Sequence, residues 1–127
     1  MEFTLKTKLQ ATAKQVYKAW LSIQGHTKMT GGGAFVSDWV GDNYTTWDGY
    51  LYGKNLELKS YEHIVQSWRS SNFLDEEEDS QIEITLSEID GETELTLNHT
   101  ILPESGKHYI KGWDEHYFQP MQAYFRT

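Results

Sequence analysis

His99 is the residue whose type and setting could most readily do chemistry, because it lies in an otherwise apolar strand pattern. Leu95, Leu97 and Ile101 alternate with polar residues around it, so the imidazole is expected on the inward face of a strand over residues 93–102. An imidazole with an ordinary pKa of about 6.5 could orient a ligand or act as a general base. An inward histidine is more often a hydrogen-bonded core residue, and both interpretations stay open.

Motifs for nucleophilic catalysis, phosphate binding and metal binding are not found. The chain has no cysteine and no Gly-x-Ser-x-Gly elbow, and Gly31-Gly32-Gly33 follows a predicted helix instead of opening one. His108 and His116 would stand about two helical turns apart, too far for the paired ligands of a zinc helix. We therefore expect no catalytic nucleophile, no cofactor and no metal ion.

Aromatic side chains are numerous enough to line a cavity, since the chain contains 5 Trp, 8 Tyr and 5 Phe. Such residues either fill the core or leave an apolar cavity with a few polar groups, which is the usual form of a ligand site. Periodicity does not decide between these two outcomes. The candidate wall residues are Trp39, Trp47, Trp68, Trp113, Tyr117 and Met121, with Asn55 and His99 as polar points.

A long C-terminal helix is predicted to position several of these side chains. Apolar residues recur there at steps of three and four, on the stripe Ile110, Trp113, Tyr117, Met121 and Tyr124. Ser105 is the expected N-cap. Pro120 lacks the backbone N–H of a helix interior and should bend the helix around residues 116–117.

The residues before this helix are predicted to form strands and two small helices. A strand over residues 2–9 is followed by a helix that begins at Thr12, which has capping-box spacing with Gln15, and by a second helix at 26–30. Short strands are predicted at 35–39 and 44–47, a tight hairpin turn at Asp48-Gly49, and longer strands at 50–59, 63–70, 81–89 and 93–102. Their short links indicate antiparallel pairing.

Two charged features accompany these strands. The acidic run over residues 75–79 is typical of a solvated hairpin loop. Arg69 is expected to be partly buried and paired with a carboxylate, for which Asp48 and Glu57 are the candidates.

Composition limits the class of protein. A length of 127 residues predicts a single domain, residues 1–127. The net charge of −8, with no Lys/Arg cluster, repels phosphate backbones and argues against a nucleic-acid partner. No apolar run reaches about 18 residues, so no membrane span is expected. The N-terminus has no apolar signal region, which predicts a cytoplasmic location.

A set of ordered motifs resembles one known family. They are Val16-Tyr17-x-Ala19-Trp20-Leu21, Met29-Thr30-Gly31-Gly32, Trp47-Asp48-Gly49-Tyr50-Leu51-Tyr52-Gly53, Ile64-Val65-Gln66-x-Trp68-Arg69, Leu102-Pro103, Gly112-Trp113 and Tyr117-Phe118. Together they are similar to the C-terminal domain of the activator of heat-shock protein 90 ATPase and to related stand-alone bacterial proteins, within the START-like superfamily of polyketide cyclases and lipid carriers. The resemblance covers essentially the whole chain.

The resemblance and the element order imply an α+β helix-grip fold. In this fold a curved antiparallel sheet of about six or seven strands wraps around the long C-terminal helix, with two short helices after the first strand.

Three functions are compatible with such a fold. A non-catalytic module binding a small apolar or aromatic ligand between sheet and helix would need a cavity of at least ~300 Å³. A chaperone-interacting module with a role in the stress response, implied by the resemblance, would need an exposed docking patch. A cyclase- or hydrolase-type enzyme would need His99 with a shifted pKa and a tyrosine hydroxyl within reach. We rank the enzyme third.

Overall fold

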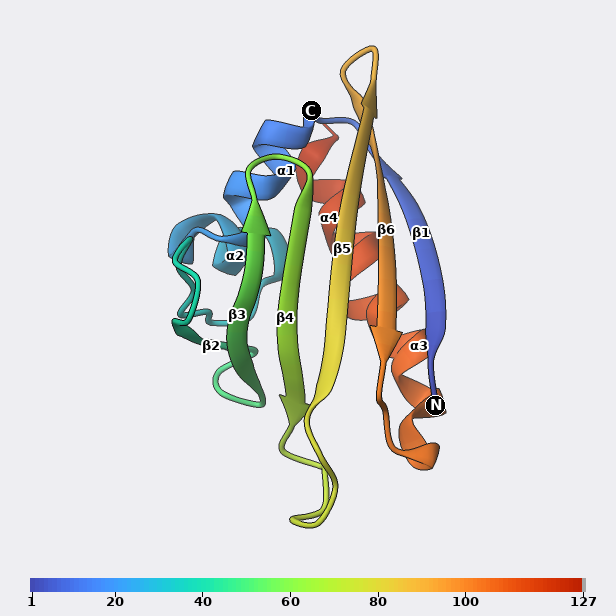
Figure 1. Ribbon diagram of the computed structural model, residues 1–127. Helices are drawn as coiled ribbons and strands as arrows, with labels where there is room; N and C mark the ends of the chain where they lie inside the picture. Colours follow the sequence, from blue (N-terminus) through green and yellow to red (C-terminus); the bar gives the residue numbers. More distant parts are fainter. Residues whose placement is uncertain (127) are drawn as a thin grey trace.

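The computed structural model describes residues 1–126 and shows an antiparallel sheet with helices packed on one face (Figure 1). The elements run β1 (Phe3–Leu9), α1 (Ala13–Trp20), α2 (Ile23–Thr30), β2 (Asn43–Thr46), β3 (Leu51–Lys59), β4 (His63–Ser70), β5 (Ser80–Ile89) and β6 (Glu92–Thr100). The strand order is β1-β6-β5-β4-β3-β2, and every neighbouring pair is antiparallel. The predicted helix-grip fold is confirmed.

The two short helices form where the local sequence caps them. Thr12 Oγ1 accepts a hydrogen bond from Gln15 N at 3.1 Å, and Gln15 Oε1 accepts one from Thr12 N at 2.8 Å, which is the predicted capping box. Ser22 caps α2, which therefore begins at residue 23 instead of the predicted 26 and includes Gly25. A Cβ on Gly25 would lie 2.9 Å from Ala19 Cα, so this glycine allows a tight corner between the helices.

The segment over residues 35–39 is not a strand, contrary to the prediction. Phe35 makes only an isolated bridge to Thr45. The carbonyl oxygens of Ser37 and Trp39 instead accept hydrogen bonds from Asn55 Nδ2 at 2.9 and 3.0 Å. Because one side chain satisfies both carbonyls, the segment turns over β3 without needing a strand partner.

The C-terminal helical region changes geometry along its length. A 3₁₀ turn, η1 (Glu104–His108), leads into α3 (Tyr109–Trp113), then into a π turn, η2 (Asp114–Phe118), and finally into α4 (Gln119–Phe125). Pro120 has no N–H for the carbonyl four residues back, and the chain takes the wider π turn directly before it. Residues 116–117, where a bend was predicted, lie inside this π turn. Ser105 is not an N-cap, since Pro103 precedes η1 and no side chain caps it.

The core lies between the sheet and the helices that cover it (Figure 1). Aliphatic side chains from the strands meet aromatic side chains from the helices, and the set includes Leu9, Ile64, Ile82, Ile84, Leu95, Leu97, Trp20, Trp113, Tyr117 and Met121. Each such burial contributes about 1.5–3 kcal/mol. No helix within residues 1–126 is long and apolar enough to cross a membrane.

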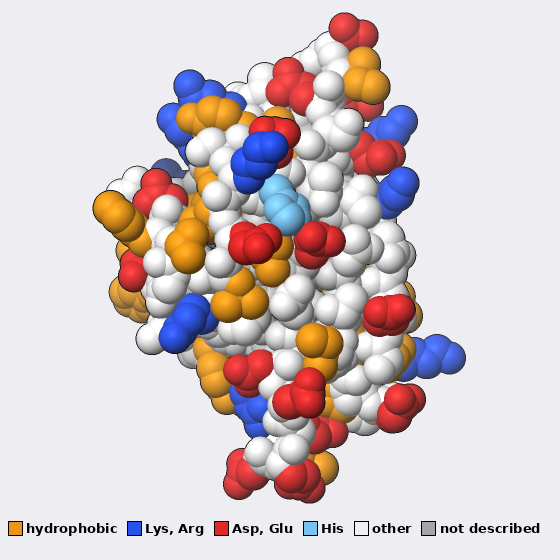
Figure 2. All heavy atoms as spheres, viewed as in Figure 1, with side chains coloured by type: hydrophobic (Ala, Val, Ile, Leu, Met, Phe, Trp, Pro, Cys, Tyr) orange, Lys and Arg blue, Asp and Glu red, His pale blue; other side chains and the backbone are white. Residues whose placement is uncertain are grey.

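Arg69 forms a carboxylate pair as predicted, but with neither of the expected partners. Its Nη1 lies 3.2 Å from Asp79 Oδ1, and the guanidinium also donates to two backbone carbonyls of the β4–β5 loop. In the β3–β4 register Arg69 stands opposite Tyr52, and its side chain reaches along the strand to the loop. Acidic side chains gather at this end of the face shown in Figure 2, as expected of a solvated loop.

Candidate functional site

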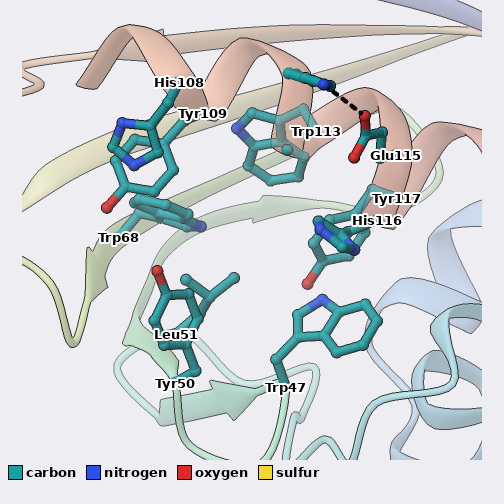
Figure 3. A pocket seen from close by; sticks show the side chains of 12 residues that line it. Trp47, Tyr50, Leu51, Trp68, His108, Tyr109, Trp113, Glu115, His116 and Tyr117 are labelled. Atoms are coloured by element: carbon teal, nitrogen blue, oxygen red, sulfur yellow. Dashed lines mark ion pairs between the residues drawn. The ribbon is translucent and has the colours of Figure 1, made fainter. Parts of the chain in front are cut away.

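A cleft of about 550 Å³ lies between the C-terminal helical region and one end of β3 and β4 (Figure 3). Its volume exceeds the ~300 Å³ typical of the smallest ligand sites. The sheet side of the lining consists of Trp47, Tyr50, Leu51 and Trp68. The helix side consists of His108, Tyr109, Lys111, Gly112, Trp113, Glu115, His116 and Tyr117.

Buried aromatic rings form the floor of this cleft. The ring centroids of Trp68 and Tyr109 are 4.9 Å apart, and those of Trp113 and Tyr117 are 4.8 Å apart. Trp68 and Trp113 join the two pairs at 6.1 Å. Because aromatic rings pack well in offset and edge-on arrangements, such a floor suits the face of a flat apolar molecule.

The rim of the cleft is polar and exposed. His108, Lys111, Glu115 and His116 all come from the helical side. Lys111 Nζ lies 3.4 Å from Glu115 Oε1, in an exposed pair one helical turn long. Exposed pairs of this kind contribute little stability, so the rim can rearrange at small cost.

His99 is buried in the core and does not line the cleft. Trp113 Nε1 donates to His99 Nδ1 at 3.0 Å, so the ring proton must be on Nε2, which donates to Ser80 Oγ at 2.9 Å. Ser80 Oγ in turn donates to the carbonyl of Trp68 at 2.7 Å. Burial lowers the pKa of His99 to about 3, so the imidazole is neutral at physiological pH. His99 therefore holds Trp68 and Trp113 in place through hydrogen bonds, and no tyrosine hydroxyl is among its partners.

A second buried histidine, His26, is not among the residues predicted for the site. Its Nδ1 donates to the carbonyl of Trp20 at 2.8 Å, so Nε2 accepts from Tyr117 Oη at 3.1 Å. Tyr117 Oη also lies 3.2 Å from Thr46 Oγ1. Burial lowers the pKa of His26 to about 4 and raises the pKa of Tyr117 well above its ordinary value. This chain of contacts ties α2 and β2 to the helical wall of the cleft.

The structure brings together Trp47, Trp68, Trp113 and Tyr117 from the predicted set of wall residues. Met121 is fully buried in the core, while Asn55 and His99 are buried in hydrogen-bond networks outside the lining. Trp39 is 71 % exposed, and its contact with β3 is through its backbone carbonyl, which accepts from Asn55 Nδ2. Trp39 is thus not part of the cleft wall.

Several lining residues were missed although a signal for them existed. Tyr109, Gly112 and His116 follow one another at steps of three and four, on the same helix face as Trp113. Tyr50 and Leu51 directly follow the predicted hairpin turn, and the turn geometry brings them beside Trp47. No cluster of three or more metal-ligating side chains occurs among the described residues.

A family model described as "Activator of Hsp90 ATPase homolog 1-like protein" matches residues 10–126. No curated protein matches the sequence.

Several solved structures share the fold. An HSP90 activator from Plasmodium falciparum superposes with a TM-score of 0.81 at 20 % identity, covering 94 % of this chain and 91 % of that one. The Aha1 dimer from Colwellia psychrerythraea gives 0.82 at 14 % identity, with 99 % and 97 % covered. CalU16 from Micromonospora echinospora gives 0.82 at 19 % identity, with 98 % and 74 % covered. At such identities the likeness shows the fold alone.

Proposed function

Because the chain belongs to the family of activator of Hsp90 ATPase homolog 1-like proteins, which have a START-like fold, we propose that it is a binding module for a small, flat, apolar or aromatic molecule. The molecule would lie in the cleft between the β3–β4 end of the sheet and the C-terminal helical region. A volume of about 550 Å³ and a floor of closely packed aromatic rings support this proposal.

The observation that carries the proposal is Gly112. The other nine of the ten glycines have a local reason: four have a positive φ, and five would bring a Cβ within 3.2 Å of a neighbouring atom. At Gly112 an added Cβ would meet no atom within 4 Å, and this residue lines the cleft. Glycine inside a helix costs about 0.5–1 kcal/mol relative to alanine. A costly glycine without a packing reason is explained if the space beside it must stay open for a ligand.

The test is to fill that space. Gly112→Leu places a large side chain in the cleft, Gly112→Ala adds only a methyl group, and Ala123→Leu adds the same bulk at an exposed position of α4 as a control. Thermal unfolding would be followed against a panel of flat aromatic compounds. A compound at about 100 times its Kd adds about 2.7 kcal/mol to the free energy of unfolding.

We expect wild type and Ala123→Leu to show the same rise in Tm with a given compound, Gly112→Ala to show a smaller rise because its methyl group takes part of the space, and Gly112→Leu to show none while remaining folded. An unchanged Tm of wild type with every compound would contradict the proposal. A shift that persists in Gly112→Leu would locate the binding elsewhere on the molecule.

A second candidate function is contact with a chaperone, which is favoured by the family and by an exposed apolar cluster. Phe35, Trp39 and Val40, in the segment before β2, are 71 %, 71 % and 61 % exposed. Exposed apolar side chains mark a docking surface where they form one contiguous patch. ATP hydrolysis by purified Hsp90 would be measured with wild type and with Trp39→Ser. Stimulation that Trp39→Ser loses would support this role, and equal rates with and without the wild-type chain would contradict it.

A further inference from the structure

Trp47 has an unusual backbone conformation for a large aromatic residue. Its φ is +52°, and those of Asp48 and Gly49 are +58° and +90°, so three consecutive residues of the β2–β3 turn are in the left-handed region. The sequence predicted positive φ at Asp48 and Gly49 only. A bulky side chain in this region is uncommon because its Cβ crowds the following carbonyl oxygen. Such strain persists where the surroundings hold it and is concentrated at functional sites.

The preceding glycine loop is shaped around this turn. A Cβ on Gly32 would lie 2.4 Å from Trp47 Cε3, and one on Gly33 would lie 2.4 Å from Asp48 Oδ1. Gly33 N donates to Asp48 Oδ1 at 3.2 Å, and Asp48 N donates to Gly33 O at 2.9 Å. Gly32 therefore provides the space in which the Trp47 indole lies against the loop, and Gly33 provides the space for the Asp48 carboxylate.

The indole nitrogen of Trp47 lacks a hydrogen-bond partner. Nε1 of Trp47 is the one buried side-chain nitrogen or oxygen without a partner in residues 1–126. Tyr117 Oη faces it. Burial raises the pKa of this hydroxyl, and its contact with Thr46 and the nearby indole N–H offset part of the rise. The oxygen is engaged with His26 and Thr46, and its geometry with the indole is not that of a hydrogen bond. A buried donor left unpaired is costly, and native structures rarely keep one without a functional reason.

We propose that Trp47 is the polar anchor of the cleft, and that its indole N–H donates a hydrogen bond to an uncharged acceptor oxygen of the bound molecule. This inference rests on the proposed function and narrows the ligand class to flat aromatic molecules with a carbonyl or similar acceptor on one edge. The apolar floor disfavours a charged group at that depth. His116, an exposed side chain, lies beside the indole with ring centroids 5.5 Å apart (Figure 3). For the bound molecule to reach the buried nitrogen, the His116 side chain would turn outward.

The test compares two probes of nearly identical shape, fluorene and 9-fluorenone, which differ by one carbonyl oxygen. Wild type should bind 9-fluorenone about two- to tenfold more tightly, the range expected of one net hydrogen bond. Trp47→Phe keeps an aromatic ring without the N–H and should bind both probes with equal affinity. Trp39→Phe makes the same change at an exposed position outside the lining and should keep the preference.

A direct readout is the ¹H–¹⁵N resonance of the Trp47 indole in wild type, assigned through bonds, so this test stands even if Trp47→Phe does not fold. 9-Fluorenone should move this resonance downfield and slow its exchange with solvent, and fluorene should do neither. Equal affinities with an unmoved Trp47 resonance would overturn the anchor and leave binding in the cleft intact. Failure of wild type to bind either probe would contradict the proposed function and the anchor together.

Discussion

Gly112→Ala should stabilise the protein, although glycine at this position is part of the proposed ligand site. The added methyl group meets no atom within 4 Å, so it neither clashes nor gains packing. The remaining effect is the lower conformational freedom of alanine in the unfolded chain, about 0.5–1 kcal/mol. An unfolding entropy of about 2.1 cal/mol/K per residue gives ~270 cal/mol/K for 127 residues. The expected rise in Tm is therefore about 2–4 °C.

Gly25→Ala is the matched control, because Gly25 also lies inside a helix, α2. Its Cβ would stand 2.9 Å from Ala19 Cα and 3.1 Å from Ala19 O, both backbone atoms of α1. The two helices would have to move apart, so we expect a loss of about 1–3 kcal/mol in place of a gain. Urea unfolding followed by tryptophan fluorescence and far-UV circular dichroism would measure both variants, with the m-value as a check on two-state behaviour.

Opposite signs for the two variants would show that open space at position 112 is a property of the cleft wall. A destabilised Gly112→Ala would refute this reasoning, since it would mean that the position is closed in solution. Gly112 would then be explained by packing, and the observation that carries the proposed function would fail.

Three further predictions concern buried and loop interactions. His99 and His26 have pKa values of about 3 and about 4 in the folded protein, below the ordinary value of about 6.5, so the unfolded chain binds more protons below pH 6.5. The free energy of unfolding should be insensitive to these two groups above about pH 7. Between about pH 6 and 4 it should fall by up to about 2.7 kcal/mol per pH unit as the pH is lowered. Urea titrations at several pH values should show this fall, and His99→Gln should roughly halve its slope. Asn55→Ala should lower the free energy of unfolding by about 2–4 kcal/mol, because two loop carbonyls and the Gln66 amide lose their hydrogen-bond partner. Urea unfolding would measure this loss, and a change below about 0.5 kcal/mol would contradict the prediction. Arg69→Gln should speed hydrogen exchange in the β4–β5 loop while that of β5 and β6 stays unchanged, and unaltered loop exchange would show that the guanidinium does not order it.

Local patterns were sufficient for most of the elements. The capping box at Thr12 was predicted correctly, as were the positive φ values at Asp48 and Gly49, because these features depend on residues close in sequence. The segment over 35–39 was predicted wrongly as a strand, because its carbonyls are satisfied by Asn55, a side chain from β3. No local pattern carries that information.

In the site, too, some features follow from residues close in sequence and others from packing between distant segments. The sequence by itself determined the family, the element order and the abundance of aromatic side chains, all of which depend on residue types and their spacing. Whether those aromatics would fill the core or border a cleft was decided by the separation of the helical region from β3 and β4, which depends on packing between distant segments. Trp39 and Trp47 lie in the same stretch before β3, yet one is exposed and the other lines the cleft. The direction of each tryptophan follows from contacts with Asn55 and with the glycine loop, and such contacts exist only once the chain has folded.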